Sequence, residues 1–110
     1  MYIVSFTTFT KRFKFVPTMI KSLLAQTFKD FRIVMTLYKD DVSNLTDELK
    51  KFIDDGTIEL LVADENLKPN LKYYYCMLKY HDMPIITVDD DRIYSPNLIE
   101  TLVNTYEHLD

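Results

Sequence analysis

The sequence of 110 residues contains one glycine, Gly56, and this shortage excludes the two common glycine-rich phosphate-binding loops. Neither G-x-G-x-x-G nor G-x-x-x-x-G-K-S/T can be formed, because each needs more than one glycine to bring backbone amides close to phosphate. If this chain binds phosphate, a metal ion and cationic side chains must hold it.

Cysteine and histidine are also scarce. A lone cysteine, Cys76, excludes an intramolecular disulfide and a zinc cluster, and His81 and His108 do not have the spacing of metal ligands. We expect a buried thiol at Cys76 and a surface imidazole at His81, and no cysteine nucleophile. The formal net charge is −4, with acidic and basic residues interspersed. The sequence therefore lacks the clustered basic residues typical of DNA-binding and RNA-binding proteins, and we expect no nucleic-acid partner.

Long apolar runs are absent from the sequence. No segment approaches the roughly eighteen apolar residues of a membrane span, and the first residues, "MYIVSFTTF", have no basic region typical of a signal peptide. We therefore expect no integral membrane segment and a cytoplasmic protein, with a position at the inner face of the membrane left open.

Apolar residues make up 47% of the chain, which is enough for one folded domain over residues 1–110. β-Branched and aromatic runs predict strands, and apolar residues at helical spacing predict amphipathic helices between them. The predicted strands are 2–9, 31–38, 57–63 and 84–88, and the predicted helices are 16–24, 42–53, 71–78 and 98–109. The alternation predicts an α/β fold: a mostly parallel sheet of about four strands with helices on both faces.

Local signals refine three of these helices. Gly56 is a plausible stop for the second helix, and Ser95 a plausible cap for the fourth, followed by Pro96. In the third helix, spacing directs Tyr74 and Tyr75 towards the core together with Leu71 and Leu78, and Tyr73 away from it.

Ligands of open α/β sheets bind beyond the carboxyl ends of the strands, so the loops there are the candidate site. The first loop, "TTFTKRFK", offers the hydroxyls of Thr7 and Thr8 and the positive charges of Lys11 and Arg12. This combination suits an anionic ligand. A solvated turn is an equally favoured interpretation of the loop taken alone.

The second and third loops carry weaker signals. In "YKDD", Asp40 or Asp41 is best explained as a cap of the following helix. In "DENLKPNLKYYY", Asp64 could accept a hydrogen bond from a base or ribose, and Lys72 could face phosphate. Surface lysines commonly serve solubility alone, so both interpretations of Lys72 stay open.

The last loop begins with three adjacent carboxylates in "IITVDDDRIYSP". In extended geometry Asp89 and Asp91 point one way and Asp90 the other. Two carboxylates on one face form a hard-oxygen site for Mg²⁺ or Mn²⁺, which completes its shell from water and phosphate oxygens. The alternative is a strand end whose carboxylates cap the next helix or meet only solvent.

Four segments in this order resemble the nucleotide-binding half of GT-A fold glycosyltransferases, particularly bacterial family-two-like enzymes. "TTFTKR" follows the first strand, and "SLLAQTFKDFRIVM" is similar to the family's run from first helix to second strand. "ADENLKPNLK" follows the third strand, and "VDDD" stands where the family's D-x-D signature ends a strand. The resemblance covers the whole chain and implies the N-terminal, Rossmann-like half of that fold.

The resemblance also implies roles for individual residues. Asp89 would contact the ribose or sugar of a nucleotide-sugar, and Asp91 would coordinate the metal that bridges its phosphates, with Asp89 as a further metal ligand. Thr7 and Thr8 would line the nucleotide pocket, and Asp64 and Lys72 would flank base and ribose. The expected nucleotide-binding set is Thr7, Thr8, Lys11, Arg12, Asp64, Lys72, Asp89 and Asp90.

The implied activity is metal-dependent transfer of a sugar from a UDP- or GDP-linked donor to an acceptor hydroxyl, as in the synthesis of bacterial cell-surface polysaccharides. In this family the catalytic base and the acceptor site lie beyond the D-x-D, so the resemblance implies that this chain supplies only the donor-binding half. The alternative is a non-catalytic nucleotide-binding or protein-interaction module derived from a truncated glycosyltransferase, in which exposed sheet edge and apolar surface favour a homodimer. A phosphate-transferring hydrolase ranks third, because the first strand ends in threonines where such enzymes carry an aspartate nucleophile.

Overall fold

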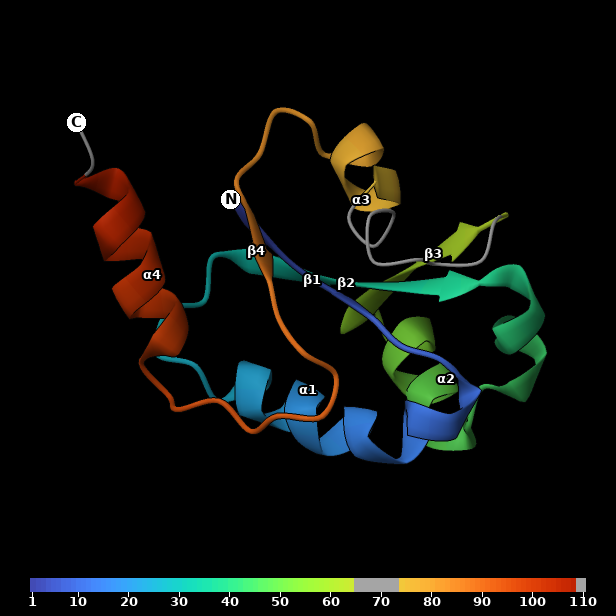
Figure 1. The fold of residues 1–110 in the computed structure, drawn as a ribbon. Helices are drawn as coiled ribbons and strands as arrows, with labels where there is room; N and C mark the ends of the chain where they lie inside the picture. The colour runs from blue at the N-terminus through green and yellow to red at the C-terminus, as the bar shows by residue number, and fades with distance from the viewer. Residues whose placement is uncertain (65–73, 109–110) are drawn as a thin grey trace.

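Four parallel strands form one sheet in the order β3-β2-β1-β4 (Figure 1). The computed structural model describes residues 1–64 and 74–108. The strands are β1 (Tyr2–Thr7), β2 (Phe31–Tyr38), β3 (Ile58–Ala63) and β4 (Ile85–Thr87). All three strand pairs are parallel, which confirms the fold class predicted from the β-α alternation. The predicted first strand, 2–9, runs two residues past the end of β1, and the predicted fourth strand, 84–88, is one residue too long at each end.

The helices are α1 (Val16–Leu24), α2 (Asp47–Asp54), α3 (Tyr74–Lys79) and α4 (Leu98–Glu107). Short 3₁₀ helices precede α1 and α2 at η1 (Thr10–Phe15) and η2 (Lys39–Asn44). The second helix was predicted from residue 42, but α2 begins at Asp47 because the Thr46 hydroxyl accepts a hydrogen bond from the Leu49 N–H at 3.3 Å. Gly56 does end this segment, and its φ of 82° is the left-handed conformation that favours glycine.

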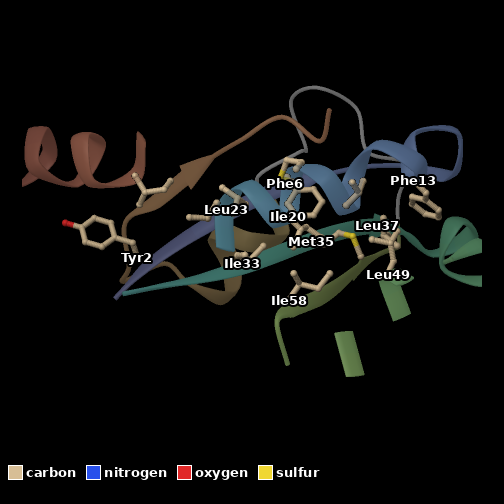
Figure 2. Close-up of a cluster of buried hydrophobic side chains, with 14 of the residues drawn as sticks. Tyr2, Phe6, Phe13, Ile20, Leu23, Ile33, Met35, Leu37, Leu49 and Ile58 are labelled. Carbon is tan, nitrogen blue, oxygen red and sulfur yellow. The ribbon is translucent and has the colours of Figure 1, made fainter. Parts of the chain in front are cut away.

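Helices lie on both faces of the sheet, as predicted (Figure 1). α1 and α2 cover one face, where alternate residues of β1 and β2 meet the apolar stripe of α1. Figure 2 shows Phe6, Met35 and Ile20 in this layer. At one end of the layer Tyr2 packs edge-to-face on Tyr106 of α4, with ring centroids 6.0 Å apart. The main core therefore joins α1, α2 and α4 to one side of the sheet.

The opposite face is covered by α3 and holds a much smaller buried cluster, formed by Ile3, Val34 and Cys76. The predicted buried thiol is confirmed, and burial raises the pKa of Cys76. His81 lies at the surface, as predicted.

The predicted orientation of the third helix is wrong. Tyr74 is 52% exposed and Leu78 60% exposed, whereas Cys76 between them is fully buried. Two residues along an α-helix correspond to about 200°, so Cys76 facing the sheet turns Tyr74 and Leu78 outward. Tyr75 is half-buried, and the predictions for Leu71 and Tyr73 fall outside the described residues.

Glu59 of β3 links α3 and the residue that follows it to the sheet by ion pairs and hydrogen bonds. Its carboxylate accepts hydrogen bonds from Lys79 Nζ at 2.8 Å, from the Tyr80 hydroxyl at 2.6 Å and from Arg32 Nη1 at 3.2 Å. Burial raises the pKa of Glu59, but the hydrogen bonds from Lys79 and Tyr80 outweigh burial, and the pKa lies below its usual value. The stability contributed by α3 therefore depends on pH.

We expect Glu59→Gln to lower the free energy of unfolding by about 1–2 kcal/mol at pH 7, because Lys79 and Tyr80 lose a charged acceptor. The folded-state pKa of Glu59 lies below the unfolded value of about 4.3. Its contribution is therefore fully present above that pH and is lost as the pH falls through the folded-state pKa. Urea unfolding of the two proteins at pH 7 and pH 3 measures both effects.

Glu48→Gln is the matched control, because Glu48 forms a more exposed ion pair with Lys21 at 3.4 Å. This variant should unfold within about 0.5 kcal/mol of the wild type at pH 7. A deficit of Glu59→Gln that stays the same at pH 3 would contradict the assignment.

Candidate functional site

The carboxyl ends of β1 and β4 bring the first and last candidate loops together. β1 and β4 are neighbours in the sheet, with Ser5 paired to Thr87, and the N–H of Val88 donates to the carbonyl of Ser5 at 3.0 Å. Parallel neighbours end at the same edge of a sheet, so the loop after Thr7 and the loop after Thr87 must share that edge.

Arg12 joins the two loops through the aspartates. Its Nε donates to both carboxylate oxygens of Asp90, at 3.1 and 2.9 Å, and its Nη2 lies 2.6 Å from Asp91 Oδ2. Asp90 is only 7% exposed. Hydrogen bonds and charge from Asp90, and then from Asp91, raise the pKa of Arg12 further above its usual value. A single cation from the first loop thus forms ion pairs with two of the three carboxylates.

Aromatic rings flank this guanidinium. The Arg12 Cζ lies 5.9 Å from the ring centroid of Phe9 and 6.0 Å from that of Phe15, both within cation-π range. The two phenylalanines are partly exposed. They restrict the positions that the guanidinium can adopt.

The third carboxylate, Asp89, pairs with its own neighbour. Arg92 Nε lies 3.1 Å from Asp89 Oδ2, and both side chains are exposed. The expected division, with Asp89 and Asp91 on one face and Asp90 on the other, required an extended strand through all three. β4 ends at Thr87 and the chain turns at Asp90 and Asp91, so these two share Arg12 instead.

Tyr94 holds the backbone of this turn, and the sequence analysis missed it. Its hydroxyl accepts a hydrogen bond from the N–H of Asp89 at 2.7 Å, and its own N–H donates to Ser22 Oγ at 3.1 Å. Burial is the main cause that raises the pKa of Tyr94. Tyr94 therefore connects the aspartate turn to α1 as a neutral phenol at physiological pH.

Gln26, just after α1, fixes the chain that follows the turn. Its Nε2 donates to the carbonyl of Ser22 at 3.1 Å and to that of Ser95 at 2.7 Å, and its Oε1 accepts from the N–H of Ile99 at 3.0 Å. Gln26 is fully buried. All the polar atoms of this side chain are used to tie α1 to the start of α4.

This arrangement corrects the expected cap of α4. The helix begins at Leu98, so Ser95 is not its N-cap, and Asn97 at that position makes no side-chain capping bond. Gln26 supplies that bond from 73 residues away along the chain. Side-chain capping by a distant residue leaves no local signal, so the sequence favoured Ser95, the nearest residue of the usual type.

The expected role of Asp41 also changes. Asp41 Oδ1 accepts from the hydroxyl and the backbone N–H of Thr10, at 2.6 and 3.3 Å, whereas Thr46 caps α2. The Thr10 hydroxyl in turn accepts from Asn44 Nδ2 at 3.2 Å. The loop after β2 is thus hydrogen-bonded to the loop after β1. Because Arg12 pairs the loop after β1 with the loop after β4, the loops after β1, β2 and β4 are connected.

The remaining predicted site residues are placed as follows. Thr7 is half-buried at the end of β1, and Thr8 is buried, with a hydroxyl that has no hydrogen-bond partner within residues 1–64 and 74–108. Lys11 is exposed on η1, and Asp64 is exposed one residue beyond β3. Lys72 lies outside the described residues.

Two further observations concern the part of the chain that the structure describes. No group of three or more His, Cys, Asp or Glu side chains is arranged there to hold a metal ion. Its helices are too short or too polar to cross a membrane.

No family model and no curated protein sequence matches this chain. Its fold does match crystal structures of TarS from S. aureus. Each match covers 96% of this chain. The TM-score is 0.67 for TarS, at 17% sequence identity, and 0.68 for TarS 1-349 in complex with UDP, at 16% identity. For TarS 1-349 the TM-score is 0.64, at 19% identity. The chain covers only 19%, 32% and 31% of those structures. At these identities the likeness shows the fold alone, an α/β fold with a parallel sheet.

We expect Gln26→Ala to lower the free energy of unfolding by about 2–3 kcal/mol, because the buried N–H of Ile99 loses its partner together with two carbonyl groups. Urea unfolding measures the loss, and hydrogen exchange should show faster exchange at Ile99. Asn104→Ala, on the exposed side of α4, is the control and should change little. Equal stabilities of the two variants would contradict the role assigned to Gln26.

Proposed function

We propose that this chain is the donor-binding part of a sugar-nucleotide-dependent glycosyltransferase. One observation carries the proposal: the aspartate turn after β4 lies against the cationic loop after β1, at the carboxyl edge of a sheet whose fold matches a structure solved in complex with UDP. That edge is where open α/β sheets bind their ligands.

A nucleoside diphosphate fits the chemistry of this edge. Lys11 is exposed and Arg12 partly so, and both carry positive charge close to the end of β1. Because a glycine-rich loop is absent from the sequence, these side chains and a metal ion are the groups available for phosphate. Thr7 and Thr8 would line the nucleotide pocket, and Asp64 and Lys72 would approach the base and ribose.

Asp89 and Asp91 are the proposed metal-binding residues. Their side chains are 64% and 42% exposed, and each has one oxygen paired with an arginine, Arg92 or Arg12, so a cation would bind the free oxygen or replace the arginine. Mg²⁺ and Mn²⁺ accept one or two carboxylates when water and substrate phosphates supply the other ligands, so the donor set fits either ion. When bound, such an ion stabilises the charge that develops on a leaving diphosphate.

Transfer of the sugar to an acceptor hydroxyl is proposed for a larger assembly than this chain. The matched TarS structures are three to five times longer than the part that the chain covers. We propose that the acceptor site and the base that removes the acceptor proton come from residues outside the present sequence.

The test is isothermal titration of UDP and of GDP, each with and without Mn²⁺, into the wild type and Asp91→Ala. We expect binding that requires Mn²⁺ and is weakened at least about tenfold in the variant, roughly 1.4 kcal/mol. Asp82→Ala, an exposed carboxylate between α3 and β4, is the control and should bind like the wild type. Binding that is indifferent to both Mn²⁺ and Asp91 would overturn the proposed site.

A second candidate function is protein interaction beside β4. In the described part of the chain β4 is an edge strand, and next to it lies an open, mostly apolar cleft of about 400 Å³. The cleft is lined by Met77, Tyr80, His81, Met83, Ile85 and Thr87. Exposed strand edges and apolar surfaces favour association, which is the observation behind a homodimer.

Light scattering after size-exclusion chromatography tests this candidate over a range of protein concentrations. If the cleft mediates association, the mass should rise with concentration, and Met77→Ser should return it towards the monomer. Leu24→Ser, at an exposed apolar position on α1, is the control. A monomeric mass at every concentration would rule out self-association through this surface.

A further inference from the structure

We propose that Arg12 is an exchangeable counter-cation of the aspartate turn. In this proposal Arg12 keeps its Nε on Asp90 and transfers its Nη2 from Asp91 to a phosphate oxygen of the bound diphosphate. This transfer leaves the carboxylate of Asp91 open to a divalent cation. The proposal rests on the proposed nucleotide site and adds a mechanism that couples the binding of its two ligands.

The two contacts of Arg12 differ in strength. Asp90 is buried and receives Nε on both oxygens, so separation would leave a buried carboxylate without a counter-charge. Breaking such a buried pair is costly, whereas exposed ion pairs contribute little. Asp91 is partly exposed and receives a single contact from Nη2. Arg12 is therefore anchored at Asp90 and exchangeable at Asp91.

The surroundings of Arg12 allow a small rearrangement and resist a large one. The rings of Phe9 and Phe15 flank the guanidinium, and Asp90 holds it from the side of Nε. A guanidinium presents its donors as a fixed fork, so Nη2 can change partner while Nε stays in place. A lysine at the same position would have one ammonium group to divide between the two tasks.

The positive charge of Arg12 then couples the binding of the cation to the binding of the diphosphate. Without nucleotide, a divalent cation at Asp91 competes with Nη2 and experiences the positive charge of Arg12 at short range. A diphosphate attracts Arg12 and the cation alike, so each ligand strengthens the binding of the other. Such coupling is reciprocal and typically amounts to between about 5-fold and 150-fold in affinity. Arg12 would prevent the turn from holding a metal ion in the absence of nucleotide.

The experiment measures Mn²⁺ affinity from the electron paramagnetic resonance signal of free Mn²⁺, with and without UDP. We expect Arg12→Gln to bind Mn²⁺ alone about fivefold more tightly than the wild type, and to lose most of the tightening produced by UDP. Lys50→Gln removes one positive charge from an exposed position on α2 and should behave like the wild type.

Two further variants keep the proposal testable if Arg12→Gln fails to fold. The double variant Arg12→Gln with Asp90→Asn removes the buried charge together with its partner and should lose the coupling in the same way. Arg12→Lys keeps the charge without the fork, and we expect weak Mn²⁺ binding together with reduced coupling. Circular dichroism establishes that each variant is folded before titration.

The outcomes separate this proposal from the proposed function. If the wild type binds UDP with Mn²⁺ and the coupling is unchanged in folded Arg12→Gln and in the double variant, the exchange is wrong and the nucleotide site stands. If the wild type shows no UDP binding under any condition, the proposed function and the exchange both fail. Tighter binding of Mn²⁺ alone with lost coupling supports both.

Discussion

The buried carboxylate of Asp90 is the constraint on which the rest of the candidate site depends. A charge withdrawn from water needs a partner, and Arg12 supplies it from 78 residues away along the chain. This pair holds the loop after β1 against the loop after β4 and fixes the distance between the cationic and the acidic sides of the site. Phe9 and Phe15, which flank the guanidinium, and Asp91, which shares it, are placed by the same pair.

A second network, of uncharged hydrogen bonds, connects the aspartate turn to α1. Gln26 connects α1 to the carbonyl of Ser95 and to the N–H of Ile99, while Tyr94 connects Ser22 to the backbone of Asp89. Both side chains are satisfied by backbone groups, so they are required for the path of the chain and not for its charge. The "SLLAQTF" segment, which contributes to the family resemblance, thus has a physical function in this fold: it positions the aspartate turn.

The two faces of the sheet are stabilised by different means. The face under α1 and α2 is a continuous apolar layer, whereas α3 adds only a small cluster around Cys76 and relies on the ion pairs of Glu59. The side of the molecule beside α3 also carries the open cleft next to β4. The carboxyl edge of β1 and β4 is built largely on the well-packed side, where Ser22, Gln26 and Arg12 belong to α1 or its flanks, and this gives the proposed nucleotide site a rigid support.

The order of the elements and the parallel sheet were determined by the sequence alone, because hydrophobic periodicity is a local property and β-α alternation favours parallel strands. The sequence also predicts a site at the carboxyl edge of that sheet. The shortage of glycine likewise excludes a glycine-rich phosphate-binding loop. Only the tertiary structure decided that Asp90 pairs with Arg12, that Gln26 caps α4 and that Cys76, not Tyr74, faces the sheet. Two of these depend on contacts between residues more than seventy positions apart, and the third on how a six-residue helix rotates against its neighbours. Neither kind of information is present in a short stretch of sequence, since both arise when the folded chain buries one set of groups in preference to another.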